Sequence, residues 1–89
     1  MSETIKEARM VYLFEAIQRG SLRAAADALG IAPSAVTRQI TLLEQELAIP
    51  LIERHARGVT PTEAGRLFVA YFREQRAHQR DILSNVQEL

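Results

Sequence analysis

Five polar residues with helical spacing form the clearest candidate binding surface in the sequence. They are Ser34, Thr37, Arg38, Thr41 and Gln45, which recur at i, i+3, i+4, i+7 and i+11. Hydroxyls, an amide and one guanidinium can approach base edges and phosphates closely, whereas carboxylates would be repelled by phosphates. This stripe carries no carboxylate, so it predicts a face that contacts DNA. The competing interpretation is a solvated helix face that happens to lack acids.

Three neighbouring residues on this helix have side chains suited to particular DNA groups. Arg38 can donate a forked pair of hydrogen bonds to a guanine edge. Gln39, at the edge of the stripe, can pair with adenine or hold a phosphate. Thr37 can contact a phosphate or a thymine methyl.

A second group of candidates follows this helix, at the tip of an expected hairpin. Arg54 and Arg57 flank His55 and Ala56, just before Gly58. An arginine at a protruding tip can enter the minor groove or pair with a phosphate. Taken alone, these residues are better explained as a solvated turn. Because they follow the polar helix directly, the DNA-contact interpretation is favoured.

The sequence offers no constellation typical of an enzyme. There is no cysteine, and the two histidines, His55 and His78, belong to separate expected elements without metal-ligand spacing. Glu44 and Glu46 are two residues apart on a helix and do not share a face. We therefore predict no catalytic residue, no metal site and no cofactor.

The first element needed to position these candidates is a helix with one apolar face. Ser2 or Thr4 is expected to cap its start, and Gly20 is expected to end it. Its apolar residues follow helical spacing, at Met10, Leu13, Phe14 and Ile17.

Two further helices are separated by only three residues. Ser21 is the expected N-cap of the second helix, and Gly30 is expected to end it in the left-handed conformation. Pro33 suits the first turn of the third helix. Two helices joined by a three-residue turn with glycine are typical of a helix-turn-helix. The third helix is anchored by an apolar stripe that leaves its polar face open, at Val36, Ile40, Leu43 and Leu47.

A hairpin and a long helix are expected to complete the chain. The short β-prone runs around residues 53–58 predict the hairpin. The last helix begins either with Thr60 as N-cap and Pro61 as its first residue, or with Thr62 as N-cap.

The last helix carries a seam with heptad-like spacing, which predicts pairing with a second chain. In the favoured interpretation the first two turns pack inward and the remainder pairs with another copy. In the alternative, Leu67, Phe68, Tyr71 and Phe72 cover the domain's own core, and residues 73–81 form a solvated face. The seam residues are Ala64, Phe68, Tyr71, Gln75, His78, Ile82, Asn85 and Leu89.

The composition fits one globular, mainly helical domain. The chain has 89 residues, of which 47% are hydrophobic and 25% charged, and its net charge is zero. Zero net charge counts against nucleic-acid binding, although Arg54 and Arg57 outnumber Glu53 locally. Residues 1–6 lack the pattern of a signal peptide, and no apolar run has the ~20 residues of a membrane span. We expect a cytoplasmic protein with no membrane partner.

Two segments together carry a resemblance to a known family. The stretch GSLRAAADALGIAPSAVTRQITLLEQEL, followed by IPLIERHARGVTPTEAG, closely resembles the N-terminal domain of LysR-type transcriptional regulators over roughly residues 10–65. The resemblance implies a mainly α fold, with a winged helix-turn-helix over 1–61 and a linker and dimerisation helix over 62–89. It also implies that a homodimer binds double-stranded promoter DNA, with a recognition helix of about 33–47 in the major groove and a wing of about 51–60 on the minor groove or backbone.

The same resemblance assigns the expected site residue by residue. Arg54 and Arg57 match the family's wing arginines. The matches at the start of the recognition helix are Pro33, Ser34, Ala35, Thr37 and Arg38. The departures from the commoner family residues are Pro33 for Gln, Thr37 for Ser, Thr41 for a basic residue, Ala48 for Gly, Ile52 for Phe and Pro61 for Leu.

Family members usually carry a C-terminal effector-binding domain, and this sequence ends at Leu89. We expect the excised DNA-binding part of a longer effector-responsive regulator, with a natural short homologue as the alternative. A small-molecule effector is expected only if such a domain exists. The competing function is a helical protein-interaction and dimerisation module without DNA readout, in which Arg38, Arg54 and Arg57 have no role in binding.

Overall fold

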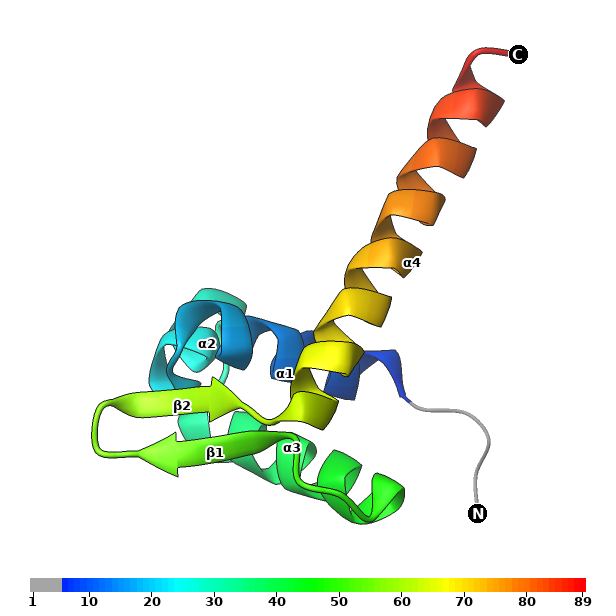
Figure 1. Ribbon diagram of the computed structural model, residues 1–89. Helices are drawn as coiled ribbons and strands as arrows, with labels where there is room; N and C mark the ends of the chain where they lie inside the picture. The colour runs from blue at the N-terminus through cyan, green and yellow to red at the C-terminus, as the bar shows by residue number, and fades with distance from the viewer. Residues whose placement is uncertain (1–5) are drawn as a thin grey trace.

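The computed structural model describes residues 6–89 (Figure 1). Three helices and a two-stranded antiparallel hairpin gather at one end, and a long fourth helix projects from them. This is the predicted winged helix-turn-helix followed by a long helix. The elements are α1 (Glu7–Arg19), α2 (Leu22–Leu29), α3 (Pro33–Leu47), β1 (Ile52–His55), β2 (Gly58–Pro61) and α4 (Glu63–Gln87).

Helix α1 begins after Lys6 and ends at Gly20. The Lys6 side chain makes no capping hydrogen bond, and the two predicted caps, Ser2 and Thr4, lie outside the described residues. Gly20 has a φ of 70°, a left-handed conformation that suits glycine and confirms the predicted end of α1.

The connection between α2 and α3 follows the prediction closely. The Ser21 hydroxyl accepts a hydrogen bond from the Ala24 amide at 3.1 Å and so caps α2. Gly30 ends α2 with a φ of 69°, and Pro33 occupies the first turn of α3. Ala25 and Ala26 of α2 are completely buried, which lets the neighbouring helices approach closely.

The core lies between these helices and the hairpin. Three residues of the predicted α3 stripe, Val36, Ile40 and Leu43, are completely buried, and Leu47 packs against the core while remaining partly exposed. Leu13 of α1 and Leu51, just before β1, are almost completely buried with them. The apolar stripe therefore anchors α3 as expected.

The hairpin is fixed to the turn between α1 and α2. The Val59 amide donates to the Gly20 carbonyl at 3.0 Å, and a Cβ on Gly58 would overlap that same oxygen. Pairing runs from Ile52 opposite Pro61 to His55 opposite Gly58, so Ala56 and Arg57 form the tip.

Helix α4 is joined to the core through its first turn. Thr62 is its N-cap, because the Thr62 hydroxyl accepts from the Gly65 amide at 3.1 Å and donates to the Pro50 carbonyl at 2.8 Å. The alternative start at Thr60 and Pro61 is wrong, since both residues belong to β2. A Cβ on Gly65 would overlap the Leu51 carbonyl oxygen, so glycine permits this close approach of helix and loop.

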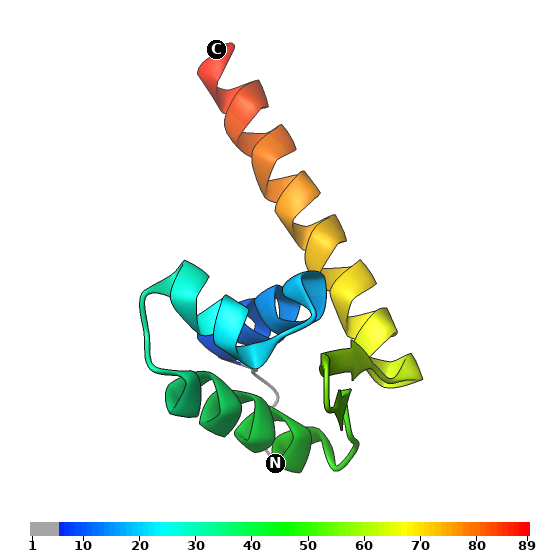
Figure 2. The same cartoon turned by 90° about the vertical axis from the view of Figure 1, so that its left-hand side faces the viewer.

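Beyond this turn, α4 leaves the core quickly (Figure 2). Val69 and Phe72 are buried, and the Phe72 ring lies 4.9 Å from that of Phe14 in α1. Of the four residues that the alternative interpretation placed over the core, Phe68 and Phe72 do pack inward, whereas Leu67 and Tyr71 are 69% and 51% exposed. Every residue from position 73 onwards is exposed. Within residues 6–89, no helix is both long enough and apolar enough to cross a membrane.

Candidate nucleic-acid interface

The polar face of α3 is open to solvent. Ser34 and Arg38 are exposed, while Thr37 and Thr41 on the same face are partly buried. The apolar side of α3 is fixed against α1 and α2, so this polar side is the surface left free for a ligand.

Of the remaining predicted residues of α3, some lie on its outer surface and one, Gln39, faces α1. Pro33, in the first turn, and Gln45, near the end, are exposed, and Ala35 is partly buried. Gln39 lies towards α1, where its amide oxygen accepts a hydrogen bond from Arg9 Nε at 3.0 Å. Gln39 therefore occupies the rim between the two helices and not the centre of the exposed face.

The wing residues are exposed as predicted. Arg54, His55 and Arg57 all lie at the solvent-facing end of the hairpin. The His55 ring nitrogen Nε2 and the Thr60 hydroxyl are 2.8 Å apart, which links the two strands on one face. The wing thus presents two guanidinium groups on a short hairpin that is hydrogen-bonded to the domain.

The three arginines of the candidate interface have no carboxylate partners in the described part of the chain. Between residues 6 and 89 the ion pairs are Arg9 with Glu46 and Arg19 with Glu15. Arg38, Arg54 and Arg57 take part in neither pair. Their positive charges are therefore available for phosphates or for acceptor atoms on bases.

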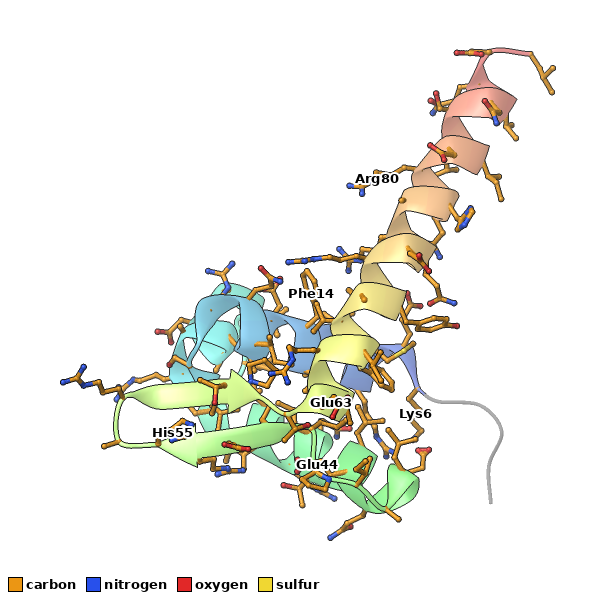
Figure 3. All side chains as sticks on the ribbon, viewed as in Figure 1. Lys6, Phe14, Glu44, His55, Glu63 and Arg80 are labelled. Carbon is orange, nitrogen blue, oxygen red and sulfur yellow. The ribbon has the colours of Figure 1, made fainter. Side chains whose placement is uncertain are left out.

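A carboxylate joins α3 to the wing. Glu44 Oε2 accepts hydrogen bonds from the backbone amides of Leu51 at 2.7 Å and Ile52 at 3.3 Å. Glu44 lies beneath the start of β1, while His55 lies further along the hairpin (Figure 3). Arg80, on the projecting part of α4, lies far from both. The third helix and the hairpin therefore form one connected surface, and α4 leads away from it.

Sequence reasoning did not identify Arg9, Glu44 and Glu46 as contributors to this geometry. One signal was available, because carboxylates in the last turns of a helix oppose the helix dipole and are disfavoured there unless they have partners. Both glutamates have such partners, since Glu44 accepts from the two backbone amides and Glu46 lies 3.4 Å from Arg9.

The structure divides the predicted dimerisation seam into two parts. Phe68 packs against the domain's own core, whereas Tyr71 is half exposed. Gln75 Nε2 donates to the Tyr71 hydroxyl at 2.7 Å. The exposed distal members are His78, Ile82, Asn85 and Leu89.

A shallow apolar groove lies at the base of α4. Its rim contains three large exposed apolar side chains, Ile49, Leu67 and Tyr71. Its remaining lining comes from Leu47, Leu51, Ala64 and Phe68. One side of this groove is formed by α4, the helix that carries the exposed apolar residues at its far end.

No group of residues in the described part suggests metal chemistry. Among residues 6–89, no three His, Cys, Asp or Glu side chains lie close enough together to hold a metal ion. His55 is on the wing and His78 on the projecting part of α4, so the two rings do not converge on one site.

Sequence comparison connects this geometry to a family of regulators. The family model described as "Bacterial regulatory helix-turn-helix protein, lysR family" matches residues 8–66. The nitrogen assimilation regulatory protein nac of Klebsiella aerogenes is 42% identical over 65 residues, covering 73% of this chain and 21% of the relative. The HTH-type transcriptional regulator CzcR of Bacillus thuringiensis is 38% identical over 88 residues, covering 98% of this chain and 27% of the relative. This chain thus spans only about a fifth to a quarter of these relatives.

Solved structures give the same result for the fold. The BenM_DBD/catB site 1 DNA complex contains a chain that superposes with a TM-score of 0.84 at 31% identity, covering 94% of this chain and 93% of that one. The CbnR_DBD-DNA complex superposes with a TM-score of 0.80 at 28% identity, covering 96% of this chain and all of the other. Both of these neighbours were solved with DNA.

Proposed function

The chain belongs to the lysR family of bacterial helix-turn-helix proteins, which are DNA-binding transcription regulators and not enzymes, and on this premise we propose a specific mode of DNA recognition. Helix α3 enters the major groove of a double-stranded promoter site and reads its sequence. The hairpin β1–β2 acts as a wing on the minor groove or backbone. Residues 1–61 carry the DNA-binding function, and residues 62–89 link and pair two copies.

One observation carries this proposal: the exposed face of α3 is free of carboxylates and presents an arginine that makes no ion pair among residues 6–89. Arg38 has five donors in a planar fork and can bind the O6 and N7 acceptors of guanine together. Ser34, Thr37 and Thr41 are short enough to let the helix approach base edges and phosphates. Pro33 and Ala35 supply small apolar surface at the end of α3 that enters first.

The wing supplies a second contact at a fixed distance from the first. Arg54 and Arg57 are positioned by the hydrogen bond from Val59 to Gly20, and Glu44 fixes the start of the hairpin to α3. Because both links are short, a DNA site that accepts α3 meets the wing arginines without a large rearrangement. Their contacts with phosphates contribute affinity rather than base readout.

Selection of bound duplexes from random DNA tests the proposal directly. The chain is expected to enrich a defined sequence, and Arg38→Ala and Arg54→Ala are each expected to weaken binding to it while the helical circular-dichroism signal is unchanged. Recovery of no preferred duplex from the selection would contradict sequence-specific binding. A protein-interaction module without DNA readout would show the same affinities for wild type and both variants.

We further propose that the DNA-binding unit is a homodimer paired through α4. The seam from Ala64 to Leu89 is symmetric about a point between Arg76 and Ala77, so an antiparallel pair brings each residue opposite another member of the seam. The resulting pairs are Ala64 with Leu89, Phe68 with Asn85, Tyr71 with Ile82, and Gln75 with His78. A two-fold axis requires this kind of self-complementary surface.

The antiparallel arrangement also covers the apolar surface that the monomer leaves exposed. Ile82, Leu83 and Val86 at the far end of α4 are 63%, 61% and 59% exposed. Pairing in this direction places them over the apolar groove at the base of the partner's α4, beside Leu67 and Tyr71. Burial of apolar area on both sides stabilises the pair. Two recognition helices are then expected one or more DNA turns apart, ~34 Å or a multiple, on a roughly palindromic site.

Disulfide trapping distinguishes the possible arrangements, because the chain contains no cysteine of its own. A chain with both Tyr71→Cys and Ile82→Cys is expected to form a covalent dimer on mild oxidation, while each single variant does not. A parallel pair would instead cross-link each single variant to its own copy. Absence of any cross-link in all three variants would count against pairing through this seam.

The whole protein is proposed to be longer than this chain. The chain covers 21% of the nac relative and 27% of the CzcR relative, which leaves room for an effector-responsive domain in a protein of their size. Since bacterial promoters lie in the cytoplasm, a promoter-binding regulator is expected to act there. A small-molecule effector belongs to that further domain and not to the residues described here.

A further inference from the structure

Arg9 of α1 contacts α3 at two positions that lie two turns apart. Its Nε donates to Gln39 Oε1 at 3.0 Å, and its Nη1 donates to Glu46 Oε2 at 3.4 Å. The side chains of Arg9 and Glu46 are only 16% and 18% exposed. Arg9 is therefore held between the two helices, and a carboxylate compensates its charge.

This contact fixes the orientation of the Gln39 amide. A guanidinium group can only donate hydrogen bonds, so the amide must turn its oxygen towards Arg9. The Gln39 nitrogen then points to the other side, and within the described residues it takes part in no hydrogen bond. It also keeps contact with solvent, because that part of the structure contains no fully buried side-chain nitrogen or oxygen without a partner.

An amide held in this way has one of its two oxygen lone pairs occupied by Arg9 and its nitrogen free to donate. Bidentate pairing with adenine needs the oxygen as acceptor and the nitrogen as donor at once. With its oxygen turned towards Arg9 and its nitrogen turned away, Gln39 is better matched to a group that accepts hydrogen bonds than to the adenine edge. Its place on the rim of α3, beside the exposed stripe, favours a phosphate oxygen over a base acceptor in the centre of the groove.

We infer that Arg9 is a positioning residue that holds Gln39 as a donor to the DNA backbone, so that Gln39 contributes affinity and not base preference. This inference rests on the proposed function, since it requires α3 to lie on DNA. Arg9 itself adds little attraction for phosphates because Glu46 is paired with it. Its effect on DNA binding is exerted through the Gln39 amide.

The test uses the duplex that the wild-type chain selects and a set of single-base variants of it. Gln39→Ala is expected to weaken binding roughly tenfold on every duplex alike, because a hydrogen bond to a charged group is lost while no base is read. The dependence of affinity on salt is expected to stay unchanged, since a neutral side chain releases no counterion. A loss confined to duplexes that keep one particular base pair would overturn the backbone assignment.

A double-mutant cycle tests the role of Arg9. Arg9→Met is expected to weaken binding about as much as Gln39→Ala, and to have no further effect on affinity in the Gln39→Ala background. Its effect on thermal stability is expected to be similar in both backgrounds. If Arg9→Met weakened binding by the same factor with and without Gln39, the inference would be wrong.

Glu46→Gln serves as the matched control. It removes the ion pair but leaves the contact between Arg9 and Gln39, so binding is expected to stay within about twofold of wild type. A loss as large as that of Arg9→Met would show a general structural effect and would overturn the inference. Failure of the proposed function would appear separately, in a wild-type chain that selects no duplex.

Discussion

The Glu44 carboxylate accepts a hydrogen bond from the Leu51 backbone amide at 2.7 Å, and this contact joins the recognition helix α3 to the wing. The same oxygen accepts from the Ile52 amide at 3.3 Å, where β1 begins. A residue near the end of α3, the proposed DNA-reading helix, thus determines where the hairpin starts. The two parts of the proposed DNA surface are held in a fixed relation by one side chain.

Removing this carboxylate is expected to weaken both folding and DNA binding. Glu44→Ala leaves two backbone amides without their acceptor and is expected to lower the free energy of unfolding by about 1.5–3 kcal/mol. Urea denaturation measures the change. Gln45→Ala, one residue further along and exposed, is the control for folding and is expected to stay within about 0.5 kcal/mol. Equal stability of the Glu44→Ala and wild-type chains would show that the contact does not hold the wing.

Ala48 ends α3 in a left-handed conformation, with a φ of 58°. This conformation costs an L-residue about 1–2 kcal/mol in steric strain. Glycine has no such strain, and its loss of conformational entropy on folding costs less than that. Ala48→Gly is therefore expected to raise the free energy of unfolding by about 0.5–1 kcal/mol. A thermal melt that shows no gain would indicate that the loop relaxes around alanine.

Gly30 allows the reverse substitution, from glycine to alanine, at a second left-handed position. It has a φ of 69°, and an added Cβ would meet nothing within 4 Å. Gly30→Ala is expected to destabilise by about 1 kcal/mol through conformation alone. If Ala48→Gly raises the free energy of unfolding and Gly30→Ala lowers it in the same denaturation series, the conformational explanation is supported.

Gly65 is the point where α4 touches the loop before β1. Alanine is favoured over glycine in a helix by about 1 kcal/mol, yet a Cβ here would overlap the Leu51 carbonyl oxygen. Gly65→Ala is expected to destabilise by about 1–3 kcal/mol, since the helix must move away. Ala70→Gly, at an exposed position of the same helix, separately measures the difference in helix propensity between alanine and glycine. A stabilising Gly65→Ala would mean that the approach of α4 to the loop is looser than described.

Leu43 anchors α3 at the centre of the core. It is completely buried, and Leu43→Ala is expected to lower the free energy of unfolding by about 2–5 kcal/mol. Leu42→Ala, at the neighbouring and only partly buried position, is expected to lower the free energy of unfolding clearly less than Leu43→Ala does. A loss below about 1 kcal/mol at Leu43, again by urea denaturation, would contradict the buried stripe.

Local patterns in the sequence were sufficient to predict most of the fold. The bounds of α3, Pro33 to Leu47, match the predicted recognition helix of about 33–47. Ser21 and Gly30 delimit α2 as expected, because caps and left-handed ends depend on a few neighbouring residues. The start of α4 was ambiguous since Thr60 and Thr62 both have capping chemistry, and only the pairing of β2 excludes Thr60.

The features that sequence reasoning missed depend on residues far apart in the chain. Arg9 and Gln39 are 30 positions apart, and neither side chain alone indicates the other as its partner. On α4, the heptad spacing gave a seam through Phe68 and Tyr71, but the buried side chains are Val69 and Phe72, while Phe68 is only partly buried against the core. Periodicity predicts that a helix has an apolar face, while the side of the helix that meets the core is fixed by neighbours such as Phe14. The DNA-contact and dimerisation residues stay predictions.

The most direct measurement is an amide NMR titration of the chain with the duplex that it selects. The largest shift changes are expected at residues 34–38 of α3 and at 54–57 of the wing, with small changes around Arg80 on the projecting part of α4. If the changes gathered on α4 and left Thr37 and Arg38 unaffected, the account of α3 as the DNA-reading helix would be wrong.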